Sequence, residues 1–198
     1  MLTIVIRIFL YSLILSISAG FVFLDSTQLQ SAEDSYTEMA QEAMLFLIAI
    51  IGWFYSRKTD QYKTFILFLV AFSSVFFIRE FNNYLSDNFF KGAWQVGVLI
   101  ILIPSIIYFY KKRVLLKSDV LALKETAPFG IIMLGGILLI VFSRIYGNKH
   151  IWMNFMGDNY LRMIKEVSEE SIELMAYTVI FIGFIELLFL SKRIQNKS

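Results

Sequence analysis

Apolar residues gather in six long runs that short polar stretches separate. The runs cover residues 4–24, 40–56, 62–81, 93–110, 127–146 and 171–191. Each run has about the length that a helix needs to cross a hydrocarbon layer roughly 30 Å thick. Inside lipid, backbone polar groups must be paired, and the run at 98–103 does not alternate as a membrane barrel strand would. The pattern predicts an all-α, polytopic integral membrane bundle of six transmembrane helices, with residues 1–198 forming a single domain.

Composition supports this class and excludes others. Of the 198 residues 58% are hydrophobic and 17% are charged, whereas soluble domains carry roughly a quarter of charged residues. The chain is therefore no soluble enzyme, no disordered protein and no nucleic-acid binder. It has no cysteine and one histidine, His150, so thiolate sites and multi-histidine metal sites within one chain are excluded. We expect no cofactor, with a divalent cation on carboxylate oxygens as the alternative.

Positive charge alternates between the connections. One side holds the N-terminus, the connections after the second and fourth runs, and the tail, with twelve Lys and Arg residues and four acids; the other holds six bases and twelve acids. Cytoplasmic loops of membrane proteins are the more basic ones. Both termini are therefore expected on the cytoplasmic side of the cell membrane, most simply a bacterial inner membrane. The formal net charge of +2 is the sum of two opposed layers.

Small residues recur at helical spacing on the first two runs. Ser12, Ser16 and Gly20 are four residues apart, as are Gly52 and Ser56. This spacing lets helices approach closely in lipid. We expect packing inside one bundle, with a seam between copies of the chain, or with another membrane protein, as the alternative.

Three other local features bear on the helices. Pro104 and the pair Gly135-Gly136 predict kinks or thin points in the fourth and fifth runs. Residues 147–167 form the longest connection and predict an amphipathic stretch at the membrane interface. The first run has a cleavable signal peptide as its alternative, with 18–20 as the small-residue site.

Several charged residues fall deep in the predicted spans. Glu42 lies about 22 Å of helix from Arg57, and Arg79 lies about 24 Å from Lys63. Both distances are shorter than the hydrocarbon layer, so Glu42, Arg79 and Glu80 are expected inside the outer leaflet. Three further residues are expected near its outer boundary: Glu38, Arg144 and Glu173.

The second and third runs predict a tight helical hairpin around residues 57–60. In an antiparallel pair centred there, Arg79 comes level with residues 39–42. We therefore expect Arg79 to pair with Glu42 or Glu38. Glu80 is not expected as its partner, because adjacent residues on a helix point about 100° apart.

The last run adds a stripe of acids. Glu166, Glu170, Glu173 and Tyr177 are spaced four, three and four residues apart, which places them on one helical face. An ionised carboxylate without a partner is costly in such surroundings, so it takes up a proton, binds a cation or reaches water. The candidate ion- or ligand-binding residues are Glu42, Arg79, Glu80, Glu170 and Glu173, and the secondary ones are Glu38, Arg144, Tyr177 and Glu186.

Structural roles are the alternative for some of these acids. Residues 35–38 have the spacing of a capping box, in which Glu38 closes the start of a helix. Residues 168–170 suit a helix N-terminus, where acids are favoured by the helix dipole. His150, beside Trp152, has a surface role as its simplest interpretation.

Three functions remain compatible with the sequence. The first is handling of protons or cations, as in a channel or transporter, which explains the surplus of outer carboxylates. The second is a non-catalytic partner, assembly or sensor subunit in the lipid bilayer. The third is an intramembrane enzyme that uses carboxylates on a lipid-linked or peptide substrate; the helical histidines of metal-dependent membrane hydrolases are absent, so an enzyme is the less favoured hypothesis.

Overall fold

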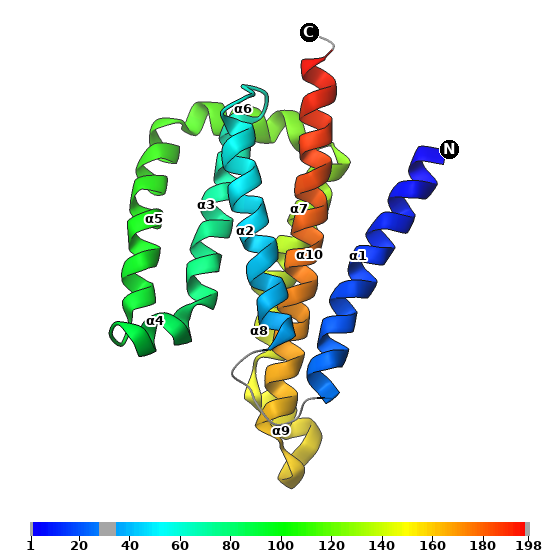
Figure 1. The fold of residues 1–198 in the computed structure, drawn as a ribbon, viewed down its shortest axis with the longest axis vertical. Coiled ribbons are helices and arrows are strands. Elements are labelled where there is room, and N and C mark those ends of the chain that lie inside the picture. Colours follow the sequence, from blue (N-terminus) through cyan, green and yellow to red (C-terminus); the bar gives the residue numbers. More distant parts are fainter. Residues whose placement is uncertain (1, 28–34, 197–198) are drawn as a thin grey trace. The chain divides into compact units, whose positions relative to one another are not determined.

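The computed structural model describes residues 2–27 and 35–196, over which the chain forms helices and no strand (Figure 1). The helices are α1 (Leu2–Thr27), α2 (Tyr36–Ser56), α3 (Lys63–Glu80), α4 (Asn82–Asn88), α5 (Ala93–Lys111), α6 (Arg113–Leu123), α7 (Ala127–Ile137), α8 (Ser143–Tyr146), α9 (Lys149–Met156) and α10 (Arg162–Gln195). A π-helical turn, η1 (Leu138–Phe142), joins α7 to α8, and a 3₁₀ turn, η2 (Gly157–Asn159), follows α9. The predicted all-helical class is confirmed.

Within the described residues, five helices are long and apolar enough to cross a membrane. They span Val5–Thr27, Tyr36–Ser56, Ala93–Lys111, Ala127–Tyr146 and Arg162–Gln195. A sixth span results if α3 and α4, which meet at a bend of 56°, count as one. The bend follows the charged residues Arg79 and Glu80 at the end of α3. The two charges therefore lie at the point where this span is interrupted.

Two connections contain helices that the hydropathy pattern does not reveal. α4 and α6 occupy stretches that were expected to be loops. In α6, Leu116, Asp119, Val120 and Leu123 share one face by their spacing and are the less exposed side of the helix. A short amphipathic helix of this kind gives no apolar run, so a search for long runs misses it.

The last helix begins earlier than predicted. α10 starts at Arg162, nine residues before the apolar run at 171. Two ion pairs with i,i+4 spacing, Arg162–Glu166 and Lys165–Glu169, lie in this polar extension and support it as helix. The expectation that residues 168–170 form a helix N-terminus is therefore wrong, since these acids lie inside a continuous helix.

The described residues group into two compact units, and α2, α7 and α10 contribute to both. Unit 1 comprises the chain up to Gln41 together with Ile131–Gly183, and unit 2 comprises Glu42–Gly130 together with the chain from Phe184 on. Each unit is described by itself below.

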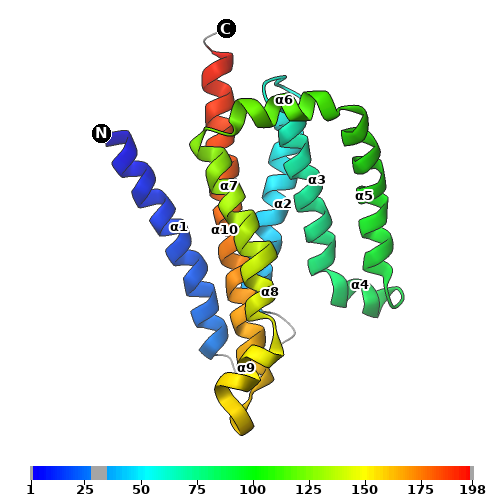
Figure 2. The same ribbon diagram turned by 180° about the vertical axis from the view of Figure 1, so that it is seen from behind.

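In unit 1 the α7 and α10 backbones approach closely (Figure 2). A Cβ added to Gly135 would lie 3.0 Å from the backbone nitrogen of Ile180, and one added to Gly183 would lie 3.0 Å from that of Ile132. Gly135 is thus the glycine of the predicted pair that allows close helix packing, whereas a Cβ on Gly136 would meet nothing within 4 Å. The π-turn η1 follows directly after these glycines.

Within unit 1, α1 contacts α10 through a different face from the one predicted. Ser18 is buried, and its hydroxyl lies 2.9 Å from that of Thr178 on α10. Ser12 and Ser16 are exposed, and a Cβ on Gly20 would meet nothing within 4 Å. The expectation that the Ser12–Gly20 face packs inside one chain is therefore wrong.

In unit 2, α3 and α5 lie side by side, with α4 at one end and α6 at the other (Figures 1 and 2). The predicted tight hairpin between α2 and α3 is present, with a turn over residues 57–62. Gly52 lets α2 approach Val70 of α3 and Phe184 of α10. Pro104 does not interrupt α5, which continues to Lys111.

Asp119 of α6 caps the start of α3. Its Oδ2 accepts the backbone N–H groups of Thr64 and Phe65 at 3.0 and 3.1 Å, two of the donors that a helix start leaves unpaired. Burial raises the pKa of the Asp119 carboxyl above its ordinary value, and the backbone hydrogen bonds only partly oppose this shift. The sequence gives no local sign of this cap, because the aspartate lies 55 residues from Thr64.

Candidate functional site on helix α10

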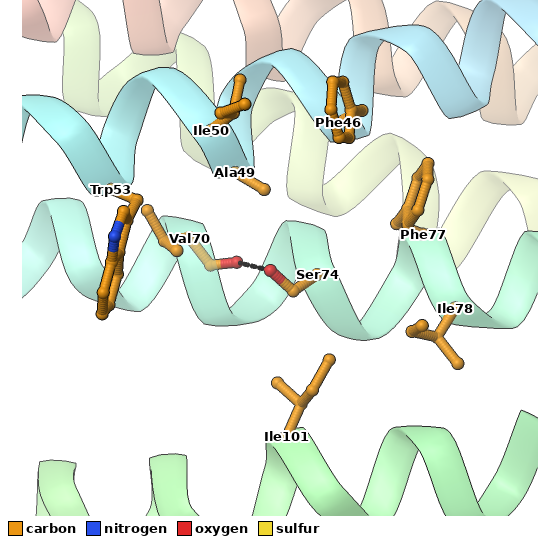
Figure 3. A pocket seen from close by; sticks show the side chains of 9 residues that line it. All are labelled: Phe46, Ala49, Ile50, Trp53, Val70, Ser74, Phe77, Ile78 and Ile101. Carbon is orange, nitrogen blue, oxygen red and sulfur yellow. Dashed lines mark hydrogen bonds between the residues drawn. The ribbon is translucent and has the colours of Figure 1, made fainter.

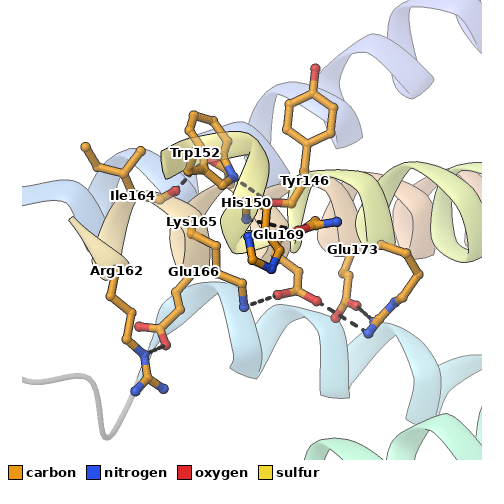
Figure 4. A network of polar contacts seen from close by, with 12 residues as sticks. Tyr146, His150, Trp152, Arg162, Ile164, Lys165, Glu166, Glu169 and Glu173 are labelled. Atoms are coloured by element: carbon orange, nitrogen blue, oxygen red, sulfur yellow. Dashed lines mark hydrogen bonds and ion pairs between the residues drawn. The ribbon is translucent and has the colours of Figure 1, made fainter. Parts of the chain in front are cut away.

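Four glutamates lie along the first three turns of α10, and three of them are paired with bases. Arg162 Nε lies 2.6 Å from Glu166 Oε1, and Lys165 Nζ lies 2.6 Å from Glu169 Oε2. The third paired glutamate, Glu173, contacts Arg144 of α8. These contacts are drawn in Figure 4.

Arg144 bridges two acids of α10. Its Nη2 lies 2.5 Å from Glu173 Oε1 and its Nη1 lies 3.4 Å from Glu169 Oε1. The side chain of Glu173 is 6% exposed, so its charge depends on this guanidinium for compensation. The sequence placed Arg144 and Glu173 at similar depth; the structure brings them into direct contact and adds Lys165 and Glu169 to the network.

The backbone around α8 makes this bridge sterically feasible. Gly147 follows α8, and a Cβ at this position would collide with the carboxylate of Glu169. Trp152 of α9 donates its indole N–H to the carbonyl oxygen of Tyr146 at 2.6 Å. Asn148 caps α9 by accepting the backbone N–H of His150. The residues around Arg144 are thus held by contacts that leave room for the Glu169 carboxylate.

Glu170 differs from its three neighbours. No hydrogen bond or ion pair reaches its carboxylate from the part of the chain that the structure describes. Glu170 is half-buried, and its charge is in addition repelled by the carboxylates of Glu38, Glu166, Asp25 and Glu173. Its backbone carbonyl accepts Gln41 Nε2 at 3.0 Å, and Gln41 is 1% exposed. We call Asp25, Glu38, Glu166, Glu170 and Glu173 the acidic cluster.

One member of the acidic cluster has a structural role that the sequence does not reveal. Asp25 accepts the backbone N–H groups of Tyr36 and Thr37 at 2.8 and 2.9 Å, and the Ser35 hydroxyl at 2.8 Å. Ser35 in turn accepts the Glu38 N–H at 3.4 Å, which is half of the predicted capping box. Asp25 therefore closes the N-terminus of α2 from the end of α1.

Arg79 contacts Glu80, the neighbour that was not expected to be its partner. Arg79 Nη2 lies 3.3 Å from Oε1 of the adjacent Glu80, although adjacent helical residues point apart. Both residues end α3, where the helix bends, and the long arginine side chain turns back to reach its neighbour. Glu42 is half-buried and forms no ion pair within residues 2–27 and 35–196, so the predicted Arg79–Glu42 pair does not form. Pairing of Arg79 with Glu38, the other predicted partner, stays a prediction.

The remaining candidates are buried on α10. Tyr177 is fully buried in unit 1, on the same helix as the stripe of acids, and Glu186 is 9% exposed in unit 2.

Among the residues described, no group of three or more His, Asp or Glu side chains is arranged to hold a metal ion. His150 is exposed on α9.

Similarity to other proteins adds nothing to this geometry. The chain matches no protein-family model, no curated protein and no solved structure. The contacts of the acids on α10 are therefore the basis for the function proposed next.

Proposed function

We propose that the chain is a multi-pass membrane protein that takes up and releases a proton, or binds a small cation, at Glu170. The observation that carries the proposal is the contrast along α10: Glu166, Glu169 and Glu173 each contact a base, whereas Glu170 faces other carboxylates. A paired carboxylate is held in its ionised form by the adjacent cation. One that faces like charges relieves the repulsion by binding a proton or a cation.

The paired acids serve Glu170 in this proposal. Arg144, bonded to Glu169 and Glu173, keeps these two carboxylates in place, so the repulsion at Glu170 is maintained rather than relaxed by side-chain movement. Gln41 bonds the backbone of Glu170 and holds the α10 turn against the start of α2. The acidic surplus also concentrates cations near this end of the helix.

We also infer six spans with both termini on the cytoplasmic side. The count takes α3 and α4 as one bent span. The cytoplasmic location of the termini is supported by the twelve Lys and Arg residues on the side of the termini, because cytoplasmic loops are the more basic ones. In this orientation the acidic cluster lies toward the outer surface. Glu170 is then accessible from the outside.

Proteoliposome flux tests the proposal. The purified chain is reconstituted, and proton flux under an imposed pH gradient is compared for the parent, Glu170→Gln and Glu166→Gln, with divalent cation flux measured in parallel. Glu166→Gln is the comparison variant from the neighbouring turn: its carboxylate pairs with Arg162 and is one of four that repel Glu170, so we expect it to reduce flux much less than Glu170→Gln does. We expect flux above empty liposomes for the parent and Glu166→Gln, and a loss of about tenfold in Glu170→Gln.

Two variants extend this comparison to the deeper acids, Glu42→Gln and Glu80→Gln. Background flux in the parent for protons and divalent cations alike would contradict the proposed function. Undiminished flux in Glu170→Gln would contradict the role of that residue. Circular dichroism and a melting curve for each variant ensure that a loss of flux is not a loss of fold.

A further inference from the structure

An apolar groove runs between α2, α3 and α5 in unit 2. Its volume is about 440 Å³, and its walls include Phe46, Trp53, Phe77 and Ile101 (Figure 3). Ser74 and Trp53 are the two side chains in the lining that carry a polar atom, and the Ser74 hydroxyl already donates to the carbonyl oxygen of Val70 at 2.8 Å. The groove therefore offers an occupant one polar donor, the indole N–H of Trp53, and is otherwise apolar.

The shape of the groove suits a hydrocarbon chain. Along α2 it extends from Phe46 to Trp53, which corresponds to about 10 Å of helix. α2 and α5 are both apolar and long enough to span a membrane, so the groove faces lipid tails in that setting. A peptide segment would bring a backbone N–H and C=O at nearly every residue, more than the Trp53 indole could pair, and an unpaired amide in hydrocarbon is costly.

One end of the groove carries positive charge. The guanidinium carbon of Arg57 lies 4.4 Å from the ring centroid of Trp53, which itself lines the groove. No acid pairs with Arg57 within the residues described. Asp60, the acid in the same turn, bonds Lys63 at 3.1 Å. The Arg57 charge is therefore directly beside the groove and is not compensated by a carboxylate.

More bases gather at this end of unit 2. α5 ends at the same end of unit 2 as the α2–α3 turn, and the junction of α5 and α6 carries Lys111, Lys112 and Arg113, all exposed (Figure 1). Arg113 stacks on Tyr110 with its guanidinium carbon 4.9 Å from the ring centroid. Basic residues beside an apolar surface attract anionic lipid headgroups.

We propose that this groove binds an anionic phospholipid. One acyl chain lies between Phe46 and Trp53, and the phosphate contacts Arg57, whose guanidinium is held over the Trp53 ring. The charge at the groove end selects an anionic headgroup over a zwitterionic one, while the apolar walls select the chain. The site is separate from Glu170, and its test does not depend on any transport activity.

Native mass spectrometry of the full chain in detergent provides the test. The protein is titrated with phosphatidylglycerol or phosphatidylcholine of identical acyl chains. We expect the parent to retain phosphatidylglycerol preferentially, and Arg57→Gln to lower this preference about fivefold while it still binds both lipids. Ala49→Phe, which fills the groove, should lower retention of both lipids about tenfold.

Matched controls lie outside the groove. Lys149→Gln removes an exposed base on α9, and Ala19→Phe adds an aromatic ring to an exposed position on α1; both should retain lipid as the parent does. Unchanged headgroup preference in Arg57→Gln would overturn the proposal. So would parental retention in a folded Ala49→Phe variant.

A second measurement does not need the groove-filling variant. With Trp94 and Trp152 replaced by phenylalanine, Trp53 is the one remaining tryptophan of the three in the chain. Phosphatidylglycerol with brominated acyl chains should quench its fluorescence to saturation, and unlabelled phosphatidylglycerol should restore it better than phosphatidylcholine. Quenching that rises without saturation, as for random contact with lipid, would overturn the proposal.

Discussion

Unit 1 and unit 2 differ in how their helices meet. In unit 1, Gly135 and Gly183 bring α7 and α10 so close that an added Cβ would lie 3.0 Å from backbone of the other helix. In unit 2, Gly52 makes one close approach, but Phe46, Trp53 and Phe77 line a groove of about 440 Å³. Glycine at a contact leaves no space for a ligand, whereas aromatic side chains between helices leave a surface that hydrocarbon can fill.

The two units also differ in the placement of charge. In unit 1, acids and bases contact each other along α10, and Glu173 is nearly fully buried. In unit 2, exposed bases gather at one end of an apolar groove. The first arrangement fits exchange of a small ion, and the second fits binding of a charged amphiphile. The predictions below test each half of this contrast.

The largest effect is expected where the backbones of unit 1 meet. Gly135→Val places a branched side chain against Ile180 and the Ala176 carbonyl, and we expect a loss of about 3 kcal/mol in stability. Gly136→Val is the matched control, since nothing lies within 4 Å of its added Cβ. Thermal unfolding followed by circular dichroism measures both. Equal melting temperatures for the two variants would show that the α7–α10 contact is not a tight one.

A smaller effect is expected from the ion-pair network. Arg144→Gln leaves the buried Glu173 without this guanidinium, and we expect a loss of about 2 kcal/mol near neutral pH, reduced from the value for fully buried pairs because Arg144 is itself half-exposed. Arg162→Gln removes an exposed pair and should leave the melting temperature almost unchanged. If Arg144→Gln melts at the parental temperature as well, Arg144 does not stabilise the acids of α10.

The smallest effect concerns the cap that positions α3, one wall of the groove. Asp119→Ala removes the acceptor for Thr64 and Phe65, and we expect a loss of about 1 kcal/mol. Asp119→Asn keeps an oxygen acceptor and should be close to the parent.

The same residue predicts a pH dependence of stability. Because burial raises the pKa of Asp119, the folded chain holds the proton at pH values where the unfolded chain has lost it. The contribution of Asp119 to stability is therefore largest in acid and falls as the pH rises from its ordinary pKa to the raised one. Asp119→Asn should remove this decrease, which unfolding curves between pH 4 and pH 7 measure. A parental decrease in Asp119→Asn would assign it to another group.

The apolar runs predict the long helices well, because a run of twenty apolar residues has few alternatives to a helix in lipid. They miss α6 and the first nine residues of α10, because both are polar enough to give no run. The ion pairs at i,i+4 spacing in 162–169 were the available signal for the extension. Charge spacing and hydropathy taken together would have predicted that the last helix begins near residue 162.

The candidate site was only partly predictable. Spacing identifies the stripe of Glu166, Glu170 and Glu173, since helical periodicity is a local property. The contacts with Arg144, and the caps made by Asp25 and Asp119, join segments 11 to 55 residues apart. Such contacts depend on tertiary packing. Equal depth along two helices was therefore not enough to predict whether Arg79 and Glu42 form an ion pair.

Exchange at Glu170 is tested most directly by infrared difference spectroscopy of the reconstituted chain across a pH titration, with the parent compared with Glu170→Gln and Glu166→Gln. A protonated carboxyl has a C=O stretching band that an ionised one lacks. We predict that one component of this band, which appears and disappears with pH in the parent and in Glu166→Gln, is lost from Glu170→Gln, while the bands of the other carboxyl groups remain. A titrating band of undiminished intensity in Glu170→Gln would contradict proton exchange at this residue.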